Sequence, residues 1–183
     1  MRRHWFPKPY ADLVARLRVP GGFLLVAAFL WLSNPTPSSL LYGLPVSLPG
    51  LWLRGWAAGH LAKNERLTTS GPYAWVRNPL YLGTLMTAAG VAIASRRWSL
   101  AVLFAAVFLF VYLPVVELEE QYLQVLFPAF DGYAAAVPML LPRGRRSSGA
   151  DRFRWSLYLH NREYQALAGF LAGAAVLVWK AYR

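Results

Sequence analysis

The residues best suited to chemistry are three carboxylates within four consecutive positions at the end of an apolar stretch. Glu117, Glu119 and Glu120 form the segment ELEE, in a chain of 183 residues with only eight acidic side chains. On a helix, Glu117 and Glu120 share one face and repel each other by about 0.2–0.5 kcal/mol. We expect a cation to stabilise the cluster. The candidates are an arginine, a divalent metal or a cationic ligand, and the arginines to consider are Arg54, Arg77 and Arg143.

A metal is the weakest of these candidates. The chain contains no cysteine, and its three histidines are far apart in the sequence. Neither zinc-ligand spacing nor a loop of spaced aspartates of the kind that binds hard cations is present. We therefore predict no metal site.

A second polar stretch, TTSGPYAWVRNPLYLG, covers Thr68–Gly83 at the start of another apolar block. One interpretation is purely structural. SGPY makes a turn, Asn78 caps a helix that begins at Pro79, and Arg77 reaches a lipid phosphate. The other interpretation is a ligand site at the membrane boundary. The stretch alone does not separate the two.

Composition indicates an integral membrane protein. Hydrophobic residues make up 57% of the chain, against about 45–50% in soluble domains, and they are concentrated in blocks. The net charge is +11, and all but three of the 19 basic residues are arginine. Because the arginines flank apolar blocks, we expect anionic lipid headgroups as partners and no nucleic acid. We also expect no secretory signal at the N-terminus.

The apolar blocks predict one all-α, membrane-embedded domain over residues 1–183 with about five transmembrane segments. A basic arm, residues 1–18, is expected to form an interfacial helix. Segments one and two are expected to form a hairpin, with segment two broken by Pro45 and Pro49. Residues 144–183 hold a basic linker and the last helix. The five segments are Val19–Ser33, Leu40–Ala62, Pro79–Ser95, Trp98–Val116 and Tyr164–Trp179.

The distribution of arginines orients these segments. If the N-terminal arm is cytoplasmic, the loop after segment two and the long stretch after segment four are cytoplasmic too, and these regions hold most of the arginines. This places both polar stretches on one face. We therefore expect a protein of the bacterial inner membrane with its site facing the cytoplasm.

Two further features lie within the membrane segments. Arg54 is a functional candidate, because an unpaired charge in a membrane is costly. Gly169 and Gly173 form a GxxxG pattern, and Gly83, Thr87 and Gly90 give segment three a face of small residues. Both patterns favour close helix packing, within the chain or between copies in a homo-oligomer.

The two polar stretches together resemble a known family. GPYAWVRNPLYLG is similar to the GPY-x-x-VRHP-x-Y-x-G signature of the isoprenylcysteine carboxyl methyltransferases and their bacterial relatives. EEQYLQVLFPAFDGYAAAVPMLLPR resembles the second signature of that family, and both occur in the expected order within residues 51–143. Membrane phospholipid N-methyltransferases share the Glu-Glu pair. There are departures: Asn78 replaces the usual histidine, and Phe130 replaces a spaced tyrosine.

The resemblance implies an enzyme that transfers a methyl group from S-adenosylmethionine to a lipophilic acceptor in the membrane. It implies Glu120 as the partner of the ammonium group of the cofactor and Arg77 as a nearby cation that orients the cofactor or an acidic acceptor. The other residues implied to bind the cofactor are Tyr73, Val76, Asn78, Pro79, Tyr81, Gly83, Glu119 and Tyr133.

The acceptor is expected to be a prenyl- or acyl-chain acid, because Arg54, Arg77 and Arg143 are the cations near the expected site and no histidine base is present there. The alternatives are methylation of a phospholipid ethanolamine, an NADPH-dependent membrane reductase and a membrane protein without catalytic activity.

Overall fold

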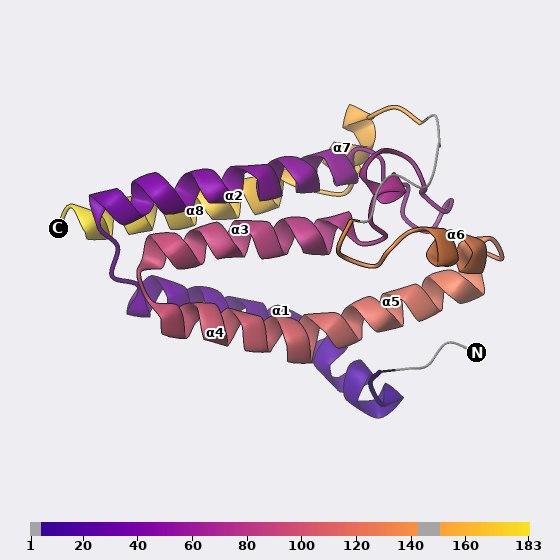
Figure 1. Cartoon of the computed structure of the whole chain (residues 1–183), viewed down its shortest axis with the longest axis horizontal. Helices are drawn as coiled ribbons and strands as arrows, with labels where there is room; N and C mark the ends of the chain where they lie inside the picture. Colours follow the sequence, from indigo (N-terminus) through magenta and orange to yellow (C-terminus); the bar gives the residue numbers. More distant parts are fainter. Residues whose placement is uncertain (1–4, 143–150) are drawn as a thin grey trace.

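The computed structural model describes residues 5–142 and 151–183, and every regular element in these ranges is helical (Figure 1). The expected all-α fold is therefore confirmed. α4, η2 and α5 run on as one helix, Trp98–Leu126. The elements are α1 (Lys8–Leu32), α2 (Pro37–Ala58), η1 (Gly71–Ala74), α3 (Pro79–Ser95), α4 (Trp98–Val107), η2 (Phe108–Tyr112), α5 (Leu113–Leu126), α6 (Phe130–Ala136), α7 (Trp155–His160) and α8 (Tyr164–Ala181).

Three helices among the described residues are long and apolar enough to cross a membrane: α1, the helix Trp98–Leu126, and α8. Many of their large apolar side chains point outward, and Trp31 and Trp98 are 86% and 81% exposed. Exposure of this kind is favourable when lipid, rather than water, surrounds the helices. α3 is a shorter apolar helix. The expectation of five spans therefore stays a prediction for α2 and α3.

α2 and α3 form the closest helix pair in the structure. A Cβ atom added to Gly50 would lie 2.6 Å from the carbonyl oxygen of Gly83, and one added to Gly83 would lie 2.7 Å from that of Gly50. Ser47 Oγ also donates a hydrogen bond of 2.9 Å to the carbonyl of Thr87. The expected packing role of the small residues in α3 is confirmed.

The predicted break in segment two and the predicted separate interfacial helix were both wrong. α2 continues through Pro45 and Pro49, and α1 is one helix through Pro20, so residues 8–18 are not a separate interfacial helix. A proline removes one backbone hydrogen bond, but neighbouring helices and side chains often compensate for it in membrane proteins. The boundaries of α3, Pro79–Ser95, are as predicted.

α1 and α2 run in opposite directions, so the chain crosses and returns as predicted, but α1 packs along α4 and α5 rather than along α2 (Figure 1). One contact shows why α1 lies there. Pro114 has no N–H to bond the carbonyl four residues earlier, that of Phe110. Tyr10 Oη of α1 donates a hydrogen bond to this carbonyl. α1 therefore occupies a position where the long helix has an unsatisfied acceptor.

The elements that carry the two polar stretches lie at one end of the bundle. Figure 1 shows η1, α6 and α7 at this end, together with the beginning of α1, whereas the α3–α4 turn and the C-terminus lie at the other end. The prediction that both polar stretches share a face is confirmed. That this face is cytoplasmic stays a prediction.

We expect single cysteines at the two ends to report this orientation. The chain has no cysteine, and both Glu65 and Ser38 are exposed, at opposite ends of α2. An impermeant thiol reagent applied to intact cells should label Ser38→Cys and spare Glu65→Cys, and permeabilised cells should label both. Labelling of Glu65→Cys alone in intact cells would invert the topology. Ser70 is fully buried and is unsuitable for this test.

Candidate functional site

The two polar stretches meet through backbone hydrogen bonds. The N–H groups of Arg77 and Asn78 donate to the carbonyls of Pro138 and Met139, at 2.9 and 3.2 Å. Arg77 and Asn78 lie just before α3, and Pro138 and Met139 follow α6. The segment after α6 is thereby held against the beginning of α3.

Arg77 and Glu120 form a two-bond ion pair at this junction. Arg77 Nε lies 2.8 Å from Glu120 Oε1, and Nη2 lies 2.9 Å from Oε2. The two side chains are only 11% and 14% exposed. Arg77 Nη1 also donates to the carbonyls of Ala134 and Val137, at 2.7 and 2.9 Å. Arg77 therefore joins α5 to the end of α6.

Asn78 completes the surroundings of Glu120. Its Nδ2 donates to Glu120 Oε1 at 2.8 Å. Asn78 occupies the N-cap position of α3, but its side chain makes no capping hydrogen bond there. The predicted capping role of this side chain is therefore wrong, because the amide points to Glu120 instead.

The neighbouring carboxylates point to other partners. Glu119 pairs with Arg18 of α1 at 3.2 Å, and Arg18 Nη1 also lies 3.5 Å from Tyr81 Oη. This pair is more exposed, with 39% and 47% of the two side chains accessible. Glu117 accepts hydrogen bonds from the backbone N–H groups of Trp5 and Phe6, at 2.8 and 3.2 Å. Each carboxylate of ELEE thus binds a different part of the chain.

The remaining predicted site residues pack around this junction. Tyr73 is buried, and its carbonyl accepts a hydrogen bond of 2.8 Å from Tyr133 Oη. Burial raises the pKa of both phenols well above the ordinary value, so both stay neutral. Val76 and Pro79 are buried, and Gly83 contacts Gly50 and Arg54 at the α2–α3 contact.

A polar cavity of about 320 Å³ lies beside the Arg77–Glu120 pair. Of the predicted site residues, Arg77 and Glu120 are the two that line it among the described residues. Sequence reasoning named Glu117 in ELEE without assigning it to the site, and it missed Gln121 and Gln124. The three residues follow one face of α5 at helical spacing. That periodicity was available in the sequence. The lining residues are Trp5, Phe6, Arg77, Leu113, Glu117, Glu120, Gln121, Gln124, Phe130 and Met139.

Arg54 is also paired. Its Nε and Nη2 lie 2.6 and 3.1 Å from the two carboxylate oxygens of Glu163, which precedes α8. Its Nη1 donates to the carbonyl of Leu80 at 3.2 Å and to Thr84 Oγ1. Arg54 and Arg77, two of the three cations expected to hold an acidic acceptor, are therefore bound to carboxylates of the protein. Arg143, the third, lies outside the described residues.

No group of three or more His, Asp or Glu side chains within residues 5–142 and 151–183 is arranged to hold a metal ion. At the ELEE carboxylates the structure places two arginines, Arg18 and Arg77, together with neutral backbone and amide N–H donors.

Comparison with known proteins first indicates a class of protein. Residues 47–129, which contain the GPY stretch and ELEE, match the model of the phospholipid methyltransferase family. This match supports a membrane methyltransferase. It ends just before α6 begins and does not include α8. The similarity to the isoprenylcysteine carboxyl methyltransferases stays a resemblance of motifs.

Two individual proteins are similar at 31% identity over 114 residues. They are the nickel-cobalt-cadmium resistance protein NccN of Alcaligenes xylosoxydans xylosoxydans and the cobalt-zinc-cadmium resistance protein CzcN of Cupriavidus metallidurans. The matched region covers 62% of this chain and 53% and 52% of the two relatives. The chain therefore spans about half the length of the curated relatives it matches. No solved structure matches the chain.

Proposed function

We propose that the protein transfers a methyl group from S-adenosylmethionine to a lipophilic acceptor within the membrane. One observation carries the proposal. The region that matches the methyltransferase family contributes Arg77, Glu117 and Glu120 to a polar cavity at one end of an apolar helical bundle. A cavity in that position is accessible to a soluble donor and to an acceptor in the membrane.

The residues of the cavity fit this cofactor. Its volume of about 320 Å³ lies within the range of small-molecule sites, about 300–1,000 Å³. Glu117 and Glu120 place carboxylates on its wall, where a sulfonium or an ammonium group can bind. Gln121 and Gln124 offer amide donors and acceptors, and Phe6 and Phe130 offer aromatic faces for a purine ring. When bound, the cofactor supplies an activated methyl group on sulfur.

The residues of the chain act in this proposal by positioning and by excluding water. Arg77 holds Glu120 and the end of α6 in place, so its role is to fix the wall of the cavity. Because Glu117 and Glu120 both line the cavity, we assign contact with the cationic part of the cofactor to these two carboxylates. Tyr133 and Tyr73 support the same wall from the side of η1.

Two acceptors remain candidates, each favoured by a different observation. The motif resemblance favours the carboxylate of a prenyl- or acyl-chain acid. The family match favours the amine of a phospholipid headgroup. Because Arg54 and Arg77 are both engaged by carboxylates, charge no longer favours the acid over the amine.

A transfer assay tests the proposal. Purified protein is incubated with S-adenosylmethionine labelled in its methyl group and with either a prenylated cysteine acid or phosphatidylethanolamine. We expect label on one of the two lipids. Base-labile, volatile label indicates a methyl ester, whereas stable label in the headgroup indicates N-methylation.

Cofactor binding is measured in the same samples, so that a wrong choice of acceptor is not mistaken for a wrong cofactor. S-adenosylhomocysteine should raise the melting temperature, because a ligand at 100 times its Kd stabilises the folded state by about 2.7 kcal/mol. Stabilisation by NADPH and none by S-adenosylhomocysteine would support the reductase and reject the methyltransferase.

A further inference from the structure

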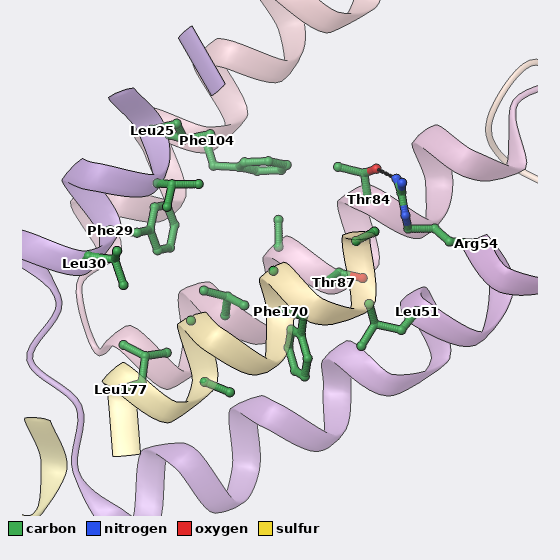
Figure 2. Close-up of a pocket in the computed structure, with 17 residues that line it drawn as sticks. Leu25, Phe29, Leu30, Leu51, Arg54, Thr84, Thr87, Phe104, Phe170 and Leu177 are labelled. Carbon is green, nitrogen blue, oxygen red and sulfur yellow. Dashed lines mark hydrogen bonds between the residues drawn. The ribbon is translucent and has the colours of Figure 1, made fainter. Parts of the chain in front are cut away.

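A second cavity, of about 310 Å³, lies within the bundle, between α8 and the helices α1, α2, α3 and α4 (Figure 2). Its lining is almost entirely aliphatic and aromatic, with Leu25, Phe29, Phe104, Phe170 and Leu177 among the labelled side chains. Polar side chains are confined to Arg54, Thr84 and Thr87 from α2 and α3. Figure 2 shows Arg54 and Thr84 together at one end of the cavity, and Leu177 lies towards the other end.

The glycines of the GxxxG pattern face this cavity. A Cβ atom added to Gly169 or Gly173 would meet no heavy atom within 4 Å, and both residues line the cavity. The predicted role of these glycines in close packing within the chain is therefore wrong. In α2 and α3, by contrast, glycines bring two backbones into contact. In α8 they leave space.

Polar side chains fix α8 at its two ends. At the first end, Glu163 holds Arg54 of α2. At the other end, Lys180 Nζ donates to the carbonyls of Leu30 and Trp31, at 2.9 and 3.2 Å, near the C-terminus of α1. Between these two attachments the glycine face of α8 forms one wall of the cavity.

The polar end of the cavity lies close to the candidate site. Arg54 donates to the carbonyl of Leu80, two residues after Asn78, which in turn binds Glu120. The three polar side chains have hydrogen-bond partners in the protein. Arg54 binds Glu163 and the carbonyl of Leu80. Thr84 donates to the carbonyl of Leu80, and Thr87 donates to the carbonyl of Gly83. The cavity therefore offers an apolar environment with a polar boundary on the side of the GPY stretch.

An occupant must be apolar along its length and carry its polar group at the Arg54 end. We propose that the cavity holds the aliphatic chain of the methyl acceptor and that Gly169 and Gly173 set its width. The assignment of the chain to the acceptor rests on the proposed methyl transfer. Water is a poor occupant, because an apolar cavity lacks the two to four polar partners that a buried water needs.

The test uses a photoreactive fatty acid, with a diazirine near the end of its chain, and the full-length protein in vesicles of phosphatidylethanolamine and phosphatidylglycerol. Cross-linked residues are located by mass spectrometry of peptides. We expect labelling of Phe29 and Phe104, which line the cavity. Phe23 is 72% exposed on α1 and reports labelling by bulk lipid in every sample.

Matched variants place two leucines on either of two faces of α8. Gly169→Leu with Gly173→Leu should abolish labelling of Phe29 and Phe104 and leave labelling of Phe23 unchanged. Ala168→Leu with Ala172→Leu is the control, because both alanines are exposed and neither lines the cavity. If the leucine variants do not fold, Gly169→Ala with Gly173→Ala narrows the same wall without a clash and should reduce labelling.

Labelling of Phe29 and Phe104 that is equal in the glycine variants and in the control would overturn the proposal, as would labelling of Phe23 alone. Cross-linking does not require methyl transfer, so its outcome is separate from that of the transfer assay. Where transfer is measured, the glycine variants should lose long-chain acceptors before short-chain ones. Loss of transfer in all proteins, with labelling intact, would reject the proposed function and keep the chain site.

Discussion

Glu120→Gln is expected to lower the free energy of unfolding by about 3–5 kcal/mol, the usual cost of removing one partner from a buried ion pair. Arg77 would remain charged with only 11% of its side chain exposed. It would keep two carbonyl acceptors but lose its counterion. The measurement is unfolding in mixed micelles by titration with dodecyl sulfate, followed by circular dichroism.

Glu119→Gln is the matched control, since it makes the same chemical change at the next residue. Its side chain is 47% exposed and pairs with an exposed Arg18, so we expect a change of about 1 kcal/mol or less. Equal losses for the two variants would show that the Arg77–Glu120 pair has no special part in holding α6 to α5. The comparison also identifies how much of any loss of activity in Glu120→Gln arises from folding.

Gly43→Ala is expected to destabilise the protein by about 1–3 kcal/mol, although alanine favours helices by about 0.5–1 kcal/mol over glycine. A Cβ atom at Gly43 would lie 2.6 Å from the carbonyl oxygen of Gly90 and would also contact the backbone of Ala94. Backbone atoms cannot rotate away as a side chain can. α2 and α3 would therefore have to separate.

Gly169→Ala provides the control with the opposite sign. No heavy atom lies within 4 Å of an added Cβ atom there. The higher helix propensity of alanine should then be the only effect, and the variant should be as stable as the wild type or more stable. The same unfolding titration measures both variants. Equal destabilisation of the two would mean that α8 packs as closely as α2 and α3 do, and that the space beside Gly169 is filled.

The sequence predicted the fold most accurately where local signals are strong. The first helical turn of α3 is set by Pro79, and its end is set by the turn at Arg96, whose φ of 52° ends the helix. Pro45 and Pro49 in α2 misled the prediction, because a proline shows that a hydrogen bond is missing but not what replaces it. At Pro114 the replacement comes from α1, which is far away in the sequence.

The sequence predicted that the two polar stretches meet, but it did not predict which arginine pairs with which carboxylate. Residues adjacent on a helix point about 100° apart, so Glu119 and Glu120 reach different neighbours, Arg18 and Arg77. Which arginine faces which carboxylate depends on where α1 lies. Likewise, GxxxG identifies a face of small residues, but packing decides whether that face touches another helix or a cavity.

The π turn at Phe108–Tyr112 changes the phase of the long helix that contains it. A π turn accommodates one extra residue, which rotates everything that follows by about 100° relative to an uninterrupted α-helix. The apolar residues of α4 and the polar residues of α5 therefore follow two different helical registers, offset by this rotation. Removal of that one residue would turn Glu120 away from Arg77 and bring a neighbouring position towards it. The length of the segment before ELEE, as much as its composition, selects which carboxylate enters the site.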